Sequence, residues 1–400
     1  MKRMLIAALA LGALAVAGCG SSSSSSTSSG GTAQVASSGS KSGKCVAAIA
    51  IEGPFTGPVA QVGLEQLHFA QLAVATDNTV NGTDVTLDQD DTTLTPSTAV
   101  AKSQAIIASS AVAVVGPAGS QEVEAVGPLF GKAGIAFVTG SATLPALTAS
   151  GKNPTFFRVV PDDDVQGPQD ANYIINHLHT KSVLIIDDDE AYSQGLVNVM
   201  IPILKKAGIT VNHQTINGND TGATLAAALK SLVTSQLTPA DAVTVLPWQA
   251  AANAQQFGLD AKQQGKKTII FGTDGINSPS QFNIAGSYVS AFGPDISSSN
   301  RALDKAIVAG VAKYGPYGSF GLPTYEAADV VMRAISSVCK SGQTPSRSNV
   351  LAAVKATHVA AAANPLGIPV AFAAGGNLAG DYGYLFHVDS AGKYVEIAPK

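Results

Sequence analysis

Most of the sequence alternates short apolar runs with segments of helical spacing. A first set opens with the apolar run at residues 45–51 (CVAAIAI) and continues with helical spacing at residues 61–75. A second set opens at residues 182–187 (SVLIID) and keeps the same order to residues 268–271. Strands that alternate with helices favour parallel sheets covered by helices, whose ligands bind beyond the carboxyl ends of the strands. The pattern therefore predicts an α/β protein with two Rossmann-like lobes and a cleft between them.

The size and charge of the chain agree with two lobes and exclude one class of partner. The chain has 400 residues, of which 46% are hydrophobic and 13% charged, which is enough for two domains. Lys and Arg number 24 against 28 Asp and Glu, which gives a formal net charge of −4. Without a basic excess the chain has no electrostatic footprint for nucleic acid, so no nucleic-acid partner is expected.

The N-terminus has the organisation of a bacterial lipoprotein signal. Two basic residues precede an apolar run at residues 4–17, which is too short for a comfortable membrane span. The sequence VAGC at residues 16–19 resembles a lipobox, in which the cysteine thiol receives a diacylglycerol. The resemblance implies a signal peptide at residues 1–18 and lipid attachment at Cys19, which would anchor an extracytoplasmic protein to the cell membrane. The alternative is an ordinary signal peptide cut near a chance cysteine.

The segment after Cys19 is rich in serine, glycine and threonine. Residues 19–44 offer almost nothing to bury, so we expect a flexible tether there. Two further cysteines, Cys45 and Cys339, form an even pair in a compartment that permits disulfides. A disulfide between them would fix the exit of the tether to the folded body. Two separate buried thiols remain the alternative.

Sequence motifs for catalysis are mostly absent. Neither Ser120 nor Ser193 lies in a G-x-S-x-G elbow, and no Walker loop or G-x-G-x-x-G follows the first strand. The acidic runs at residues 162–164 and 187–190 fall at strand ends, where carboxylates can cap the next helix or face a cleft. The second run lacks the ligand spacing and glycine of a calcium loop. We therefore expect no catalytic residue, no metal and no cofactor. A hydrolase that uses Ser120 remains an alternative, and it predicts turnover of esters or amides.

Six short segments stand in order along the chain: GPFTGPVAQVG (53–63), VGPAGS (115–120), GSATLPALT (140–148), FRVVP (157–161), QGP (166–168) and FGTDG (271–275). Together they resemble the leucine/isoleucine/valine-binding family, the type I periplasmic substrate-binding proteins of ABC transporters. The resemblance covers residues 45–400. It implies two Rossmann-like lobes with parallel sheets, joined by three crossovers and closing over one ligand. The implied division is residues 45–161 with 294–382 for the first lobe, and 162–293 with 383–400 for the second.

The resemblance implies a site for the head of an amino acid. Ser120 and Thr143 fall on positions that bind the ligand carboxylate, and Ser141 on the position whose carbonyl accepts from the ligand ammonium. A helix N-terminus at Ser120 would add backbone N–H groups and a favourable dipole. The alternatives are a plain N-cap at Ser120 and ordinary turn residues at the other two positions.

The resemblance also assigns four residues to the second lobe and the apolar wall. Asp274 falls where the family carries a glutamate that pairs with the ligand ammonium, and it is one methylene shorter. Tyr192, Trp248 and Phe320 match pocket aromatics, although Tyr192 could also be a core-edge residue. Val62 stands where many members carry an aromatic lid, so the apolar side of the pocket is expected to differ in shape.

These features predict a monomeric solute-binding lipoprotein of an ABC importer, outside the cytoplasm and lipid-anchored to the membrane. Its expected ligand is a small amino acid, with branched-chain or aliphatic side chains favoured, and its expected protein partner is the membrane permease. Within the same fold, the alternative ligands are another small carboxylate, an aromatic acid, an amide or urea. A sensor that signals through a membrane partner is a further alternative.

Overall fold

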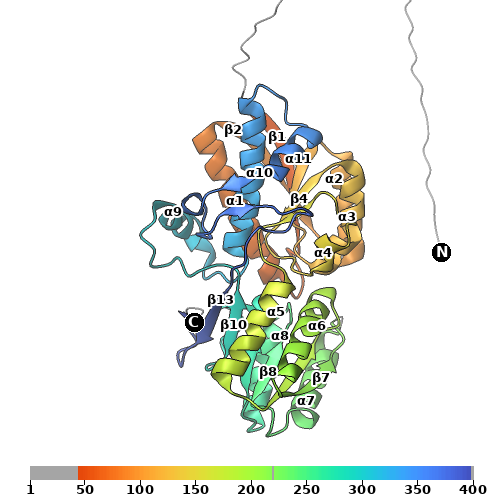
Figure 1. The fold of residues 1–400 in the computed structure, drawn as a ribbon, viewed down its shortest axis with the longest axis vertical. Helices are drawn as coiled ribbons and strands as arrows, with labels where there is room; N and C mark the ends of the chain where they lie inside the picture. The colour runs from red at the N-terminus through yellow and green to blue at the C-terminus, as the bar shows by residue number, and fades with distance from the viewer. Residues whose placement is uncertain (1–43, 219, 398–400) are drawn as a thin grey trace, which may run out of the picture. The chain divides into compact units, whose positions relative to one another are not determined.

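The protein was analysed as a computed structural model, which describes residues 44–218 and 220–397 (Figure 1). The predicted signal peptide, Cys19 and all but the last residue of the predicted tether lie outside the described residues. In the described part of the chain, no helix is long and apolar enough to cross a membrane.

The first lobe is built on a five-stranded sheet in which every neighbouring pair is parallel. Its strand order is β2-β1-β3-β4-β5. The strands are β1 (Cys45–Gly53), β2 (Thr83–Asp91), β3 (Ala111–Val115), β4 (Ala136–Thr139) and β5 (Phe156–Arg158). All residues of β3, β4 and β5 are buried, as expected of a parallel sheet covered on both faces.

Helices cover both faces of this sheet because successive strand residues point to opposite sides. In β1, Ile49 and Ile51 pack in a cluster with helices α1 and α10, whereas Ala50 packs with α2 and α3. The helices of this lobe are α1 (Ala60–Asn81), α2 (Pro96–Ala108), α3 (Ser120–Ala133), α4 (Ala146–Ala149), α9 (Ala302–Val311), α10 (Gly321–Lys340) and α11 (Arg347–Lys355). Short elements complete it: η3 (Ala312–Tyr314), β11 (His358–Val359), η4 (Ala361–Ala363) and β12 (Val370–Ala371).

The second lobe contains a seven-stranded sheet of order β14-β13-β10-β9-β8-β6-β7. The strands are β6 (Ser182–Asp187), β7 (Thr210–Thr215), β8 (Val243–Leu246), β9 (Ile269–Gly272), β10 (Tyr288–Ala291), β13 (Tyr384–Val388) and β14 (Tyr394–Ile397). Five of them are parallel, as the sequence predicts, whereas β13 and β14 join one edge in antiparallel orientation. The second sheet is therefore mixed, because the chain returns to it as a hairpin.

The same alternation positions helices on the second sheet. In β6, Val183 and Ile185 pack toward α5 and α6, whereas Leu184 and Ile186 pack toward α7 and α8. The helices are α5 (Asp163–Tyr173), α6 (Ala191–Lys206), α7 (Gly222–Ser235) and α8 (Ala251–Gln263), with a π-helical turn η1 (Ile174–Leu178) and a 3₁₀ turn η2 (Asp274–Ile276).

The chain passes between the two sheets three times. The passages lie between β5 and α5, between β10 and α9, and between β12 and β13. Each passage contributes one residue to a small apolar cluster, which we call the hinge cluster; its members are Val62, Val160, Phe292, Phe320 and Tyr382. The α/β architecture of two lobes predicted from the sequence is confirmed.

Two further details concern the predicted cysteine pair and the loop before α10. The sulfur atoms of Cys45, at the start of β1, and Cys339, in the last turn of α10, form a disulfide with Cα atoms 5.8 Å apart. The helical region from α9 to α11 is interrupted between η3 and α10, where Gly315 has a φ of +89°. This break produces the loop that carries Phe320.

Candidate functional site

A small cavity of about 10 Å³ lies between the two lobes, at the carboxyl ends of the strands. The first lobe contributes side chains that follow β2, β3 and β4, and the second lobe contributes side chains that follow β6, β8 and β9. This is where open α/β sheets bind ligands. The lining residues are Val62, Leu94, Ala118, Ser120, Ser141, Tyr192, Gln249, Asp274, Gly275 and Phe320.

The acidic side of the cavity is built around Asp274, the first residue of η2. Its side chain is fully buried, and its Oδ1 accepts hydrogen bonds of 2.7 Å from both Tyr192 Oη and Gln166 Nε2. Burial raises the pKa of Asp274 to about 6, while the bonds from Tyr192 and Gln166 lower it. Among the described residues, Oδ2 has no side-chain partner. One oxygen is therefore fixed by the protein and the other can accept from a ligand.

Further buried carboxyl groups surround Asp274 in the second lobe. Gln166 Nε2 also donates to Ser290 Oγ at 2.9 Å, and Ser290 Oγ donates to Asp170 Oδ2 at 3.1 Å. Burial raises the pKa of Asp170 and of Asp163 well above the usual value, and the charge of Asp274 raises both further. Asp163 and Asp170 do not line the cavity, so the carboxyl group that a ligand would meet is that of Asp274, whose ionised form a cation would stabilise.

Tyr192 orders the loop around Asp274. Its hydroxyl lies 2.6 Å from Thr273 Oγ1 and accepts the N–H of Gly275 at 3.1 Å. A Cβ added at Gly275 would lie 2.3 Å from the carbonyl oxygen of Trp248, so only glycine fits at this position. The hydrogen bonds of Tyr192 and this close backbone contact fix the position of η2, and with it the position of Asp274 at the cavity.

The first lobe supplies hydrogen-bond donors on the other side. Ser120 is the first residue of α3, a helix of 14 residues whose N-terminus carries a partial positive charge. Its Oγ accepts the N–H of Leu144 at 3.2 Å, which leaves its own O–H hydrogen for a second partner. Ser141 Oγ donates to the carbonyl of Ala118 at 2.7 Å and holds together the two loops that frame this wall. The wall suits an anion such as a carboxylate.

Three apolar side chains close the remaining sides. Val62 lies in α1, Leu94 follows β2 and Phe320 precedes α10. Phe320 is 5% exposed and belongs to the hinge cluster. The cavity therefore combines a donor wall, an acidic wall and an apolar surface.

The remaining predicted residues, Thr143 and Trp248, lie outside the lining of this cavity. Thr143 is buried beside it, and its carbonyl accepts the N–H of Asp163 at 3.1 Å. Trp248 packs edge-on against Phe257 in the second lobe and lines an adjacent cavity of about 200 Å³, which shares Leu94 and Gln249 with the first. Five of the seven predicted binding residues thus converge on one cavity.

Four glutamines at the site were missed by sequence reasoning. Gln166 lies within the QGP segment, so its position in a matched motif was the available signal. The other three connect the lobes, since Gln121 Nε2 donates to Gln249 Oε1 at 3.0 Å. Gln61 Nε2 adds a weaker bond of 3.4 Å to the carbonyl of Gln249. Such contacts depend on how the lobes are placed, which no local pattern encodes.

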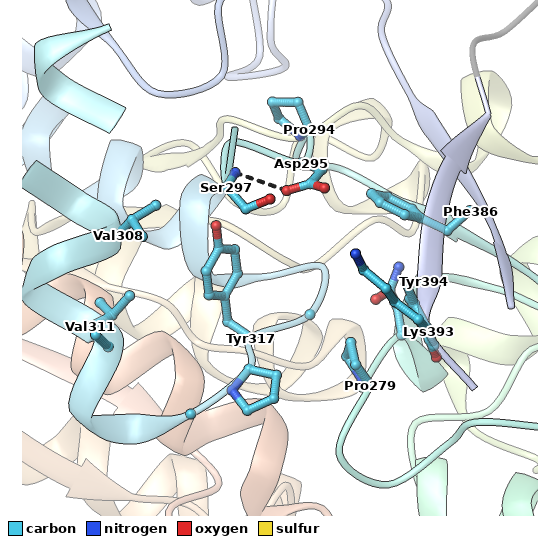
Figure 2. A pocket seen from close by; sticks show the side chains of 16 residues that line it. Pro279, Pro294, Asp295, Ser297, Val308, Val311, Tyr317, Phe386, Lys393 and Tyr394 are labelled. Atoms are coloured by element: carbon cyan, nitrogen blue, oxygen red, sulfur yellow. Dashed lines mark hydrogen bonds between the residues drawn. The ribbon is translucent and has the colours of Figure 1, made fainter. Parts of the chain in front are cut away.

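A larger groove of about 300 Å³ lies elsewhere, beside the second passage between the lobes (Figure 2). Tyr317, Val308 and Val311 face Pro279, Phe386 and Tyr394 across it. None of the seven predicted binding residues lines it. Among residues 44–218 and 220–397, no group of three or more His, Cys, Asp or Glu side chains is placed to hold a metal ion.

Comparisons with known proteins identify the family. The sequence model described as "Periplasmic binding protein" matches residues 47–393. The Leu/Ile/Val-binding protein of Citrobacter freundii is 29% identical over 296 residues, which cover 70% of this chain and 76% of that protein.

Solved structures share the fold at lower identity. The branched-chain amino acid transporter substrate binding protein LivJ of Streptococcus pneumoniae, in complex with isoleucine, is 22% identical with a TM-score of 0.73, covering 88% of this chain and all of that one (100%). A solute binding protein of R. palustris in complex with benzoate is 17% identical with a TM-score of 0.75, covering 88% of this chain and 95% of that one.

The family match spans both lobes. It confirms the prediction that the chain is a solute-binding protein and not an enzyme. Membership also implies a location outside the cytoplasm. The chain belongs to the periplasmic binding protein family and is related within it to the leucine/isoleucine/valine-binding proteins.

Proposed function

We propose that the protein binds a small aliphatic amino acid in the cavity between its lobes and delivers it to an ABC importer. The observation that carries this proposal is the pairing of opposite polarities in one cavity. The donor wall at Ser120 faces the same space as the carboxylate of Asp274. A ligand that has both a carboxylate and an ammonium group satisfies both walls at once.

In this proposal, each head group of the ligand has its own partner. The ligand carboxylate accepts from Ser120 Oγ and from the N-terminus of α3, with Thr143 nearby. The ligand ammonium donates to Asp274 Oδ2 and to the carbonyl of Ser141. Asp274 is shorter than a glutamate, and Tyr192 and Gln166 compensate by fixing its other oxygen.

The ligand side chain lies against the apolar part of the cavity. Phe320, Val62 and Leu94 offer no charged group there, so an aliphatic side chain can be buried against them without leaving a polar group unpaired. Trp248 lies in the wall of the adjacent cavity and would contact only a longer side chain.

Binding requires the lobes to open and close. A cavity of about 10 Å³ holds a single water molecule, and small-molecule sites usually measure about 300 Å³ or more. The lobes therefore separate for ligand entry and close over it by a hinge at the three passages. The ligand drives closure only by its greater affinity for the closed form.

The N-terminal prediction completes this proposal. A lipid at Cys19 and a tether up to residue 44 would keep the two lobes within reach of a permease in the same membrane. The division into lobes is proposed as residues 45–161 with 294–382, and 162–293 with 383–400. We propose that the protein acts as a monomer.

Calorimetric titration with a panel of amino acids and small carboxylates tests the proposal. We expect leucine, isoleucine or valine to bind with one ligand per chain. Binding of an aromatic acid, an amide or urea in a panel where every aliphatic amino acid fails would contradict the choice of ligand. Hydrolysis of esters or amides that depends on Ser120 would contradict the binding function itself.

A further inference from the structure

Glu65 of helix α1 accepts hydrogen bonds from three backbone N–H groups at the start of α10. Its Oε2 accepts the N–H of Gly318 at 2.8 Å, and its Oε1 accepts the N–H groups of Phe320, at 3.0 Å, and Gly321. Burial raises the pKa of Glu65 to about 7, while these three N–H groups lower it. One carboxylate thus fixes residues 318–321, which we call the clamp segment.

The clamp segment also contacts the second lobe. The N–H of Ser319 donates to the carbonyl of Asn277 at 3.3 Å, and Asn277 directly follows the turn that begins with Asp274. A Cβ at Gly318 would lie 1.8 Å from that same carbonyl oxygen, so glycine is required for the approach. The clamp segment therefore lies between Glu65 on one lobe and the turn that carries Asp274 on the other.

A second contact joins the clamp segment to the hinge. Ser319 Oγ accepts the N–H of Phe292 at 3.0 Å, and Phe292 lies in the second passage between the lobes. Phe320 packs with Phe292 and Val160 in the hinge cluster, and it also lines the ligand cavity. Phe320, which would contact the side chain of a bound ligand, is thus packed directly against two of the passages at which the lobes would hinge.

The opposite side of the clamp segment borders the groove of Figure 2. Tyr317, immediately before it, points into that groove, across from Pro279 and Tyr394 of the second lobe. Because the groove is lined by both lobes, a change in their angle changes its width. The clamp segment therefore has unfilled space on one side and the ligand cavity on the other.

We propose that Glu65 is a positioning residue of the binding site, which stabilises the closed arrangement of the lobes by holding the clamp segment against Asn277 and Phe292. The inference deepens the proposed function and rests on it, because the ligand contact it supports is that of Phe320. Glu65 does not line the ligand cavity, so it affects the ligand affinity indirectly, by stabilising the closed arrangement of the lobes.

Glu65→Gln tests this proposal, because an amide presents one acceptor and a donor where three N–H groups need acceptors. Asp77→Asn is the matched control. Asp77 lies 12 residues further along the same helix, about 18 Å away, and accepts from Asn81 Nδ2, Thr83 Oγ1 and Ser336 Oγ. The two variants are compared with the unmodified protein by calorimetric titration with L-leucine, thermal unfolding and small-angle X-ray scattering.

We expect Glu65→Gln to weaken leucine binding by about tenfold or more and to increase the radius of gyration. Asp77→Asn should lower the unfolding temperature and leave both other quantities unchanged. Affinity within about twofold of the unmodified protein, with an unchanged radius, would overturn the proposal. If Glu65→Gln does not fold, Ser319→Ala removes the acceptor for Phe292 and must show the same two effects.

Failure of the proposed function gives a different result. If the unmodified protein itself binds no leucine, leucine is excluded as the ligand, and the radii of the ligand-free variants then decide the role of Glu65. A larger radius in Glu65→Gln alone supports the positioning role, whereas identical radii contradict it.

Discussion

Tyr192 donates its hydroxyl hydrogen to Oδ1 of Asp274 across 2.7 Å, and this bond joins helix α6 to the turn after β9. Burial disfavours the ionised form of Asp274, and the bond from Tyr192 favours it. The balance leaves the pKa of Asp274 at about 6, so the carboxylate is ionised at neutral pH. A buried anion without a cationic partner costs free energy in the unliganded protein, and a ligand ammonium would remove that cost.

Asp274→Asn separates ligand binding from stability. The amide oxygen can still accept from Tyr192 and Gln166, but the charge that would hold an ammonium is lost. We expect an affinity loss of about tenfold or more, equal to about 1.4 kcal/mol, with no loss of unfolding temperature at neutral pH. Calorimetry and thermal unfolding check this. Asp241→Asn is the control, because Asp241 is a buried carboxyl of the same lobe that accepts hydrogen bonds from Ser182 and Thr238 and does not line the cavity. Equal affinities for all three proteins would remove Asp274 from the site.

The affinity should depend on pH through Asp274. Below a pH of about 6 the unliganded carboxyl is protonated and must lose its proton to pair with an ammonium. The dissociation constant should therefore rise by up to about tenfold per pH unit below that value and stay constant above it. Titrations across this range, repeated with Asp274→Asn, test the assignment. A flat profile in the unmodified protein, or a retained slope in the variant, would contradict it.

The same raised pKa of Asp274 should increase the stability of the folded protein as the pH falls, while the affinity for the ligand decreases. The folded state holds the proton of Asp274 up to a pH of about 6, whereas the ordinary value is 3.8. Between these values the folded state binds more protons, so the contribution of Asp274 to the free energy of unfolding increases as the pH falls. Affinity and this contribution to stability should therefore change in opposite directions.

Tyr192→Phe should move the pH dependence. Loss of the hydroxyl removes a bond that lowers the pKa of Asp274, so the pH below which affinity falls should increase. The N–H of Gly275 also loses its acceptor, at a cost of about 1–3 kcal/mol in unfolding free energy. Tyr394→Phe is the control, since the Tyr394 hydroxyl donates to the carbonyl of Phe282 at 2.9 Å and neither residue lines the cavity. An unchanged pH midpoint in Tyr192→Phe would contradict the coupling.

Gln121→Ala should weaken binding through the contact between the lobes. The bond from Gln121 to Gln249 forms only when the lobes are close. We expect an affinity loss of about two- to tenfold, from the roughly 0.5–1.5 kcal/mol of a neutral hydrogen bond, with little change in unfolding temperature. Gln255→Ala is the control, because the Gln255 bond to Asn283 lies within the second lobe. Both variants are titrated with leucine. Equal affinities of Gln121→Ala and Gln255→Ala for leucine would exclude the role of Gln121 in closure.

The strands and helices could be predicted because they are encoded locally. The run AVAVV of β3 is apolar at every position, and it is buried at every position in a parallel sheet covered on both faces. The turns that follow β3, β4 and β9 were recognisable as matched segments, and they contribute Ser120, Ser141 and Asp274 to the cavity.

The features that the sequence could not indicate depend on contacts between residues that are far apart in the chain. The antiparallel addition of β13 and β14 follows from the third passage between the lobes. Glu65 and Gln121 look like ordinary surface positions of helices until their partners, 253 and 128 residues away, are in place. Trp248 resembles a pocket aromatic by its place after β8, but its packing against Phe257 sets it in the wall of the adjacent cavity.

One comparison tests the central claim most directly: calorimetric titration of the protein with L-leucine and with 4-methylpentanoate, the same carbon skeleton without the ammonium group. We predict that leucine binds with one molecule per chain and that loss of the ammonium weakens binding by about a hundredfold or more. Equal affinities, or binding of 4-methylpentanoate alone, would contradict the pairing of Asp274 with a ligand ammonium and with it the proposed amino acid site.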